Sequence, residues 1–309
     1  MDFSYYHKKT VDLVNSVTLP SSTGFTSYKD NIGEVVNKGF EVQLRSTLLN
    51  TKEWYVAVFA NLAHNENEIT KISDSMKEYN RRVMDKYANY DTGYNKGDAA
   101  YADTYLQYVE GGSLTSIFAV KSLGINPANG REVFVRPDGT ITYDWNAADQ
   151  VVVGNQEPKI QGTFGFNLRW KQFSLFSTFL YECGGQRYNS TLVDKVENAR
   201  IADGNVDRRV LTGRWQKPGD LAPYGRFTKG IVSVTRPTSR FVQDYNMLSF
   251  NSLTLGYDFD MAWMKKAHIG MLRAELSGND LFHLSTVRIE RGLDYPYARS
   301  FSASLKVSF

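Results

Sequence analysis

Arg299-Ser-Phe-Ser-Ala-Ser-Leu-Lys-Val-Ser-Phe309 is the stretch of sequence that decides the fold. Its odd-numbered positions from Phe301 to Phe309 are apolar, and the residues between them are serines and one lysine. Strict alternation with a period of two indicates a β-strand with one apolar and one polar face. A strand of about ten residues with this pattern is typical of a transmembrane β-barrel, whose exterior touches lipid and whose interior is wet. The last strand of a soluble sandwich alternates in the same way, so this segment leaves both folds open.

The chain also stops on an aromatic residue. A carboxyl-terminal phenylalanine resembles the assembly signal of bacterial outer-membrane barrels. We therefore expect Phe301, Leu305, Val307 and Phe309 to form a barrel-assembly signal. The resemblance implies the barrel-assembly machinery and outer-membrane lipid as partners of this strand.

Composition excludes several classes of protein. Aromatic residues make up 14% of the 309 residues, which favours strands. No apolar run approaches the ~18 residues of a spanning helix. The net charge is +3, and basic and acidic residues are interspersed, so we expect no nucleic-acid partner. Cys183 is the single cysteine, which excludes an internal disulfide.

Eight segments have the alternation or the apolar content of strands. They are residues 2–9, 37–47, 54–63, 158–170, 173–181, 247–259, 267–278 and 299–309. Two long polar regions separate some of them. The first, residues 64–157, contains a predicted helix at 73–87 and short strands at 117–123 and 131–135. The second, residues 182–246, contains two predicted short helices near 191–199 and 206–212.

The connections between these strands differ in length in a regular way. From the first strand they run long, short, long, short, long, short and medium, so a meander places the long ones at one end. This is the organisation of outer-membrane barrels, which have long extracellular loops and tight periplasmic turns. The pattern predicts an all-β antiparallel meander over residues 1–309, forming the carboxyl-terminal part of a large transmembrane β-barrel with short helices in its long extracellular loops.

Five segments, in order along the chain, resemble the SusC/RagA family of TonB-dependent transporters. They are residues 19–25 followed by 31–41, the Gly-Asn-Gln-Glu-Pro-Lys run at 154–159, the Arg-Phe-Val-Gln-Asp run at 240–244 with Leu-Gly-Tyr at 255–257, Ser-Gly-Asn-Asp-Leu-Phe at 277–282, and Tyr-Pro-Tyr-Ala-Arg-Ser-Phe at 295–301. No single segment is decisive, but the ordered set spans nearly the whole chain.

The resemblance implies outer-membrane nutrient import and not bond chemistry. It implies a SusD-like surface lipoprotein as a lid, TonB as the energy source acting through a plug region, and an oligosaccharide or peptide as cargo. The chain contains no segment that resembles the family's signal peptide, TonB box or plug, so we expect a carboxyl-terminal portion of such a receptor. Asp138 and Asp144 are too few for the family's acidic loop to hold calcium, and we expect neither a metal nor a cofactor.

The candidate binding residues are aromatic side chains in the polar loops. No nucleophile motif, phosphate loop or metal-ligand spacing is present in the sequence, so we expect no catalytic residue. Aromatic rings among hydrogen-bonding groups suit sugar rings or peptides. The residues predicted to bind ligand are Tyr94, Tyr101, Tyr105, Trp145, Tyr188 and Trp215. The alternative is that these rings pack the loops or contact a partner.

A rival interpretation is a soluble, secreted β-sandwich that binds carbohydrate. It accounts for the aromatic content and the alternation, but not for the terminal phenylalanine or the regular loop lengths. An envelope hydrolase is a third possibility, which lacks a recognisable nucleophile or acid pair.

Overall fold

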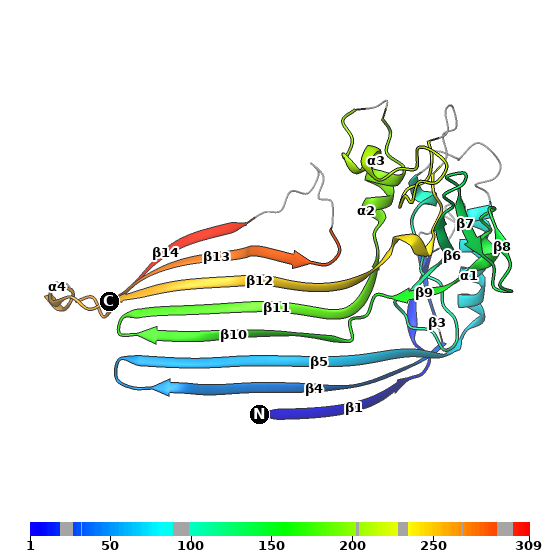
Figure 1. Cartoon of the computed structure of the whole chain (residues 1–309). Coiled ribbons are helices and arrows are strands. Elements are labelled where there is room, and N and C mark those ends of the chain that lie inside the picture. The colour runs from blue at the N-terminus through cyan, green and yellow to red at the C-terminus, as the bar shows by residue number, and fades with distance from the viewer. Residues whose placement is uncertain are drawn as a thin grey trace.

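A single continuous sheet of eight antiparallel strands dominates the structure, a computed structural model that describes residues 1–18, 27–31, 33–88, 99–201, 204–227, 234–266, 268–288 and 299–309. The strands lie side by side in chain order (Figure 1). They are β1 (Asp2–Thr10), β4 (Gly33–Asn50), β5 (Trp54–Ile72), β10 (Ile160–Trp170), β11 (Phe173–Tyr188), β12 (Val242–Phe259), β13 (Met271–Ser285) and β14 (Ser300–Ser308). Below, this sheet is called the wall.

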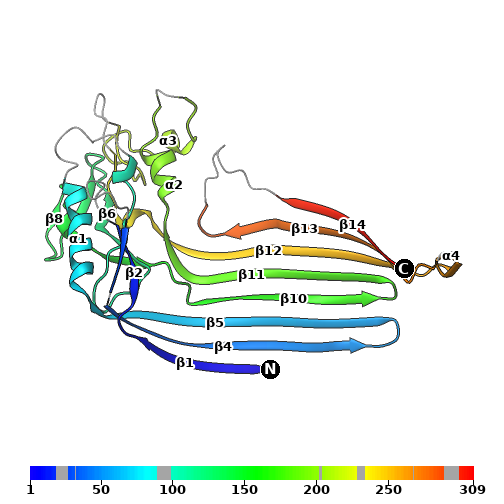
Figure 2. The same cartoon turned by 180° about the vertical axis from the view of Figure 1, so that it is seen from behind.

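The smaller elements gather at one end of the long strands, and α4 lies at the other end (Figures 1 and 2). One small sheet pairs β2 (Val14–Thr18) with β3 (Ser27–Asn31), and another has the order β8 (Ile141–Thr142), β7 (Glu132–Val135), β6 (Ser116–Ile125), β9 (Gln150–Asn155). The α-helices are α1 (Asp74–Ala88), α2 (Ser190–Leu192), α3 (Arg209–Thr212) and α4 (Ala262–Lys266). Single turns are η3 (Ala99–Tyr101), η4 (Ala147–Asp149), η5 (Val193–Glu197) and η6 (Ser239–Phe241).

All eight predicted wall strands are present, but several extend further than the sequence pattern indicated. The predicted third strand ended at residue 63, whereas β5 continues to Ile72. The added residues begin with His-Asn-Glu-Asn-Glu, which has no apolar face. They nevertheless pair with β4, where Asn67 lies opposite Asn37. Apolar alternation marks only the part of a strand that faces lipid, and the backbone ladder continues beyond it.

The predicted asymmetry of the connections is also confirmed. The turn between β10 and β11 has two residues, and Lys171 adopts the left-handed region with φ 51°. The connection between β12 and β13 contains α4, and Ile269 N donates to Met264 O within it at 2.9 Å. The predicted helix at 73–87 and the short strands at 117–123 and 131–135 correspond to α1, β6 and β7.

The wall is one layer and not two sheets packed face to face, so the described structure does not support the sandwich alternative. Within the described residues, β1 and β14 have a paired neighbour on one side only, so this sheet is not closed. Register shifts interrupt the ladders of β4, β11 and β12. Such bulges bend and twist strands, as a curved wall requires.

Candidate functional site

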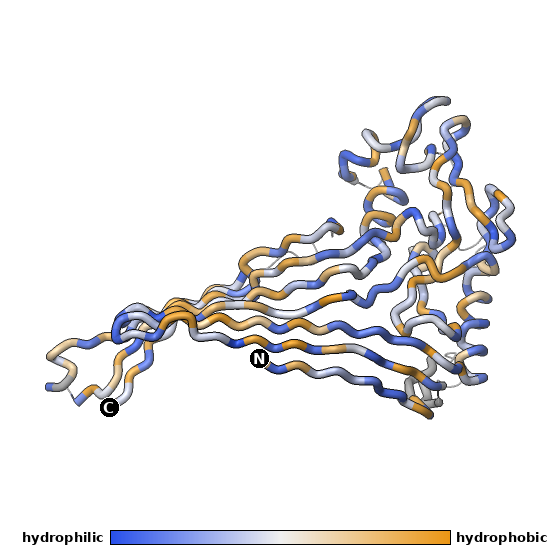
Figure 3. Tube along the Cα trace, turned by 60° about the horizontal axis from the view of Figure 1, so that its bottom comes forward, coloured by the Kyte–Doolittle hydropathy of each residue, from blue (hydrophilic) through white to orange (hydrophobic). Residues whose placement is uncertain are grey.

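One face of the wall is apolar on all eight strands. In β14 the apolar series from Phe301 to Val307 pairs with apolar or glycine positions of β13, and the same correspondence continues across the sheet to Phe3 of β1. Hydrophobic and hydrophilic residues are interspersed along the wall strands (Figure 3). Leu276, on β13, is 50% exposed. Large exposed apolar side chains over a continuous face are what a lipid-facing surface requires, so this face is called the outer face.

Two rows of aromatic rings border the outer face. One row lies at the end with the short turns, and the other lies toward the loops. The first joins Trp54, Trp170, Phe173 and Tyr257, with ring centroids 4.6 to 6.0 Å apart. The second joins Phe164, Phe179, Phe250 and Phe282, with centroids 4.4 to 5.5 Å apart. Apolar outer positions of β5 run from Trp54 to Leu62, about 26 Å along the strand at its usual rise. At the strand tilt of a barrel, about 40°, this length corresponds to about 20 Å of height, within an apolar band ~25 Å tall.

The opposite face is polar, and is called the inner face. Near the short turns, Arg273 donates to Asp258, Glu275 and Ser174 at 2.8 to 3.0 Å, which links three strands. Nearer the loops, Asn61 and Asn65 carry amides toward the same side, and the Tyr6 hydroxyl donates to Asn65 Oδ1 at 2.8 Å. A polar inner face opposite an apolar outer face is the arrangement of a barrel with a wet interior.

The predicted barrel-assembly residues lie on the outer face. Phe301 is 68% exposed and Leu305 is 65% exposed. Val307 and Phe309 are also exposed, and Phe309 follows the last residue of β14. These side chains therefore contribute little to packing within the described chain. Their role in assembly stays a prediction.

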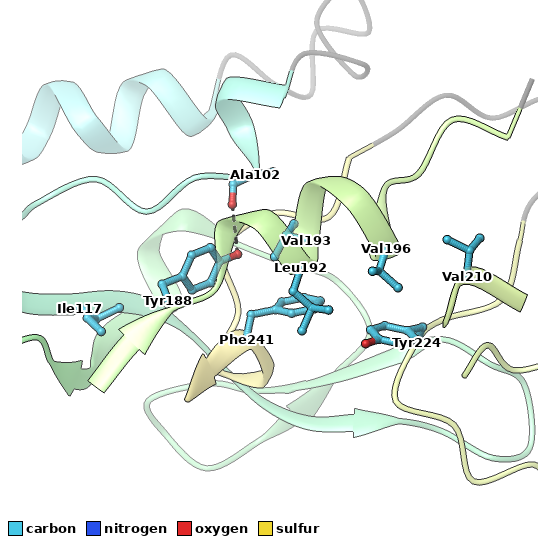
Figure 4. Close-up of a cluster of buried hydrophobic side chains, with 9 residues drawn as sticks. All are labelled: Ala102, Ile117, Tyr188, Leu192, Val193, Val196, Val210, Tyr224 and Phe241. Carbon is cyan, nitrogen blue, oxygen red and sulfur yellow. Dashed lines mark hydrogen bonds between the residues drawn. The ribbon is translucent and has the colours of Figure 1, made fainter. Parts of the chain in front are cut away.

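The elements at the loop end, together with Tyr188 at the end of β11, form a folded unit with its own core, called here the loop module (residues 74–88, 99–155 and 188–241 of the described chain). One cluster contains Ala102, Ile117, Tyr188, Leu192, Val193, Val196, Val210, Tyr224 and Phe241 (Figure 4). A second contains Val83, Tyr87, Tyr101, Val120, Phe134 and Trp145. The first cluster combines residues from the two long polar regions of the sequence, and the partly buried Val234 brings the second region against the second cluster. The loops of the two hairpins therefore fold together.

The structure brings the predicted ligand-binding aromatics mostly into these clusters. Tyr101, Trp145 and Tyr188 are at most 8% exposed. The Trp145 indole donates to Pro237 O at 2.8 Å, and the Tyr188 hydroxyl donates to Ala102 O at 3.0 Å. These contacts agree with the alternative that the rings pack the loops. Ligand binding by these residues stays a prediction.

The other three predicted residues differ in their surroundings. Tyr105 is half-buried, and its hydroxyl donates to Ala100 O at 2.9 Å. Trp215 is also half-buried; its indole donates to Pro127 O at 2.8 Å, and its ring lies where a side chain on Gly130 would clash. Tyr94 lies outside the described residues.

A buried charge cluster was missed by the sequence analysis. The guanidinium of Arg240 donates from Nη2 to Glu132 and Glu197, each at 2.9 Å, and from Nη1 to Pro223 O. All three charged side chains are at most 10% exposed. Burial lowers the pKa of the Arg240 guanidinium, but the charges of Glu197 and Glu132 outweigh this effect and raise it above its ordinary value. Arg240 thus ties β7, η5 and η6 together. In the sequence, the only indication of this role is that Arg240 begins the Arg-Phe-Val-Gln-Asp run that resembles the family.

A second buried arginine organises the same region. Arg214 donates to the carbonyl oxygens of Val210, Val196, Glu197 and Gly225 at 2.7 to 3.2 Å. Burial lowers the pKa of its guanidinium. The guanidinium of Arg214 thus supplies hydrogen-bond donors to four backbone carbonyls. These carbonyls can be buried although they belong to loops with little regular structure.

The described residues contain no cluster of histidine, cysteine or carboxylate side chains able to hold a metal ion. Asp138 instead accepts hydrogen bonds from the backbone and hydroxyl of Thr140, which shapes a tight turn. Within the same part of the chain, no helix has the length and apolar character to cross a membrane.

Three curated or solved proteins show what this chain is similar to. The TonB-dependent receptor P3 of Formosa agariphila is 25% identical over 333 aligned residues, which cover 100% of this chain and 32% of the receptor. The TonB-dependent receptor SusC of Bacteroides thetaiotaomicron is 22% identical and is covered over 29% of its length. The RagAB peptide transporter structure superposes with a TM-score of 0.73 at 21% identity, covering 99% of this chain and 33% of that chain. No protein-family model matches the chain.

These matches confirm the resemblance inferred from the sequence. Over its whole length, the chain is similar to about a third of TonB-dependent receptors such as SusC, which are outer-membrane proteins. The solved neighbours confirm the barrel-wall fold. The chain spans about a third of the length of the curated relatives that it matches.

Proposed function

We propose that this chain forms part of the wall of an outer-membrane nutrient importer. The observation that carries the proposal is the eight-stranded meander, with a lipid-type outer face between two aromatic rows and a polar inner face. The similarity to TonB-dependent receptors and to a peptide transporter supports it. A wall of this kind separates lipid from a wet path and carries no bond chemistry.

The proposed partners follow from the same likeness. A SusD-like lipoprotein closes the extracellular end, where the loop module lies, and TonB supplies energy through a plug region of the receptor. The barrel-assembly machinery inserts the strands. The cargo is an oligosaccharide or a peptide. Because the relatives are receptors and the solved neighbours are transporters, they fit the prediction of a non-enzyme.

Deleting the gene region that encodes the chain tests the proposal. The deletion strain is grown on individual polysaccharides and peptide mixtures as sole nutrients, beside the parent strain and a complemented strain. We expect the loss of growth on one nutrient and its return on complementation. Unchanged growth and unchanged uptake of labelled nutrients across the whole set would contradict the proposal.

A further inference from the structure

The short connections of the wall share one pairing of residue types. Each has a tryptophan in it or at its edge, within three residues of a lysine. The pairs are Lys52 and Trp54 between β4 and β5, Trp170 and Lys171 between β10 and β11, and Trp263 and Lys266 between β12 and β13. These connections lie at one end of the wall, opposite the loop module (Figures 1 and 2). The three pairs together are called here the turn belt.

The indole rings of the turn belt are open to their surroundings. Trp54 is 39% exposed, Trp170 is 40% exposed and Trp263 is 49% exposed. Trp54 and Trp170 stack with centroids 5.6 Å apart in the aromatic row that borders the outer face. The Trp263 indole donates to Met261 Sδ at 3.1 Å, and a thioether is a weak acceptor that a lipid oxygen can replace. A ring with one polar edge suits the boundary between lipid and water.

The lysines of the turn belt have charge to offer a partner. Lys52 and Lys266 are exposed, and neither forms an ion pair within the described part of the chain. Lys171 Nζ lies 3.7 Å from Glu53 Oε1, in a pair whose side chains are about half exposed. Such a surface pair holds its partners weakly. The backbone holds the turns together more firmly, because Lys171 N donates to Glu53 O at 2.7 Å.

Position and charge both indicate a lipid headgroup as the partner. The turn belt continues the outer face, which faces lipid, and Lys171 Nζ lies 5.8 Å from the centroid of the Trp170 ring in that face's aromatic row. Lysines outnumber acidic residues in the connections 51–53, 171–172 and 260–270. A lysine stem lies along apolar surface while its ammonium reaches the headgroups. An ammonium bonds well to phosphate oxygens, and an excess of lysine attracts lipids with a net negative charge.

We propose that the turn belt binds anionic phospholipids, with the lysine ammonium groups on the lipid phosphates and the indole rings among the glycerol and ester groups. This goes beyond the proposed function, because it concerns the lipid around the wall and not the cargo. It makes the wall selective for phosphatidylglycerol over phosphatidylethanolamine, whose own ammonium cancels the charge of its phosphate. The linked turns that carry Lys52 and Lys171 form one such position, and α4 with Lys266 forms another.

The receptor that contains this chain, reconstituted in phosphatidylcholine nanodiscs, is titrated with a photoreactive phosphatidylglycerol. A photoreactive phosphatidylethanolamine with the same acyl chains is the second probe. After illumination and digestion, mass spectrometry compares labelling of peptides from the turn belt with labelling of peptides from the lipid-facing part of β13. The local comparison is needed because the rest of the receptor also contacts lipid.

Three variants test the lysines. Lys171→Asn removes the charge and keeps a residue that tolerates the left-handed φ of 51°. Lys266→Gln does the same for α4. Lys306→Gln removes a lysine from the inner face near the same end, where it pairs with Glu275, and is the matched control. We expect Lys171→Asn and Lys266→Gln each to raise the phosphatidylglycerol concentration for half-maximal labelling about fivefold at its own turn. Labelling by phosphatidylethanolamine and the behaviour of Lys306→Gln should stay close to those of the unmodified receptor.

Three results overturn the turn belt as a phospholipid site. They are equal labelling of its peptides by the two probes in the unmodified receptor, unchanged labelling in both Lys171→Asn and Lys266→Gln, or the same loss in Lys306→Gln. Each would leave the tryptophans as part of an aromatic row without lipid selectivity. The deletion experiment is independent of this test, because the growth of the deletion strain reports nutrient import whichever lipid surrounds the wall.

Discussion

The wall and the loop module place their apolar side chains in opposite environments. On the wall, Leu276, Phe301 and Leu305 are half or more exposed, and neighbouring strands are held by the backbone ladder. In the loop module, Ile117, Val196 and Phe241 are at most 1% exposed and pack from segments far apart in sequence. The wall is therefore adapted to lipid as a solvent, and the module to water. The same kind of substitution has different consequences in the two regions.

Removing Arg240 has the largest expected effect, and it falls on the loop module. Arg240→Met leaves Glu132 and Glu197 buried without their cation, and breaking a buried pair in this way costs about 3–5 kcal/mol. We expect hydrogen exchange to accelerate across β7, η5 and η6 while the wall strands stay protected. Lys77→Met, which removes an exposed ion pair with Asp74 on α1, is the control and changes little. If hydrogen exchange also accelerated in the wall strands, the wall and the loop module would unfold together rather than independently.

The next largest effect is expected from placing a charge on the outer face of the wall. Leu276→Arg places a cation among lipid chains, at a cost of about 2–4 kcal/mol near the middle of the bilayer. Ser277→Arg, one residue along the strand, points to the polar inner face and is the matched control. The free energy of unfolding of each variant receptor is measured in lipid vesicles by titration with guanidinium. Equal destabilisation by the two variants would mean that the faces are assigned incorrectly.

A smaller effect is expected from the Tyr188 hydroxyl. Tyr188→Phe keeps the ring in its cluster but leaves the Ala102 carbonyl without this donor, at a cost of about 1–3 kcal/mol. Thermal unfolding of the loop module, followed by its aromatic circular dichroism, reports the loss. If Tyr188 serves mainly to hold ligand, the variant should instead keep the stability of the unmodified chain and lose cargo binding.

The smallest expected effect is a pH dependence at the surface of α1. Hydrogen bonds from Arg81 and Arg82 lower the pKa of Glu78 from 4.5 to about 2. Because the folded pKa is depressed, the stabilisation is complete above about pH 4.5 and disappears as the pH falls toward 2. Glu78→Gln should remove this part of the acid dependence from the melting temperature of the module. An unchanged acid profile in the variant would assign the dependence to other carboxylates.

The sequence predicted the wall better than the module for a physical reason. A lipid-facing strand repeats its apolar residues every second position, so eight segments could be recognised one by one. The core of the loop module is built from single residues such as Ile117 and Phe241, contributed by different loops. No local period marks such residues. The aromatic residues of these loops were predicted to bind ligand because of their chemistry. Only the tertiary structure shows that Trp145 and Tyr188 lie inside a core.

By itself, the sequence determined the meander, its strand order, its lipid face and its resemblance to the SusC/RagA type, because alternation and connection length are local properties. The tertiary structure decided what meets across strands and loops. It joined Arg240 to Glu132 and Glu197, which lie 108 and 43 residues earlier in the chain, and it stacked Phe59 of β5 on Phe176 of β11, two strands that are not neighbours in the sheet. These contacts depend on register and on the packing of distant loops, which a period of two does not encode.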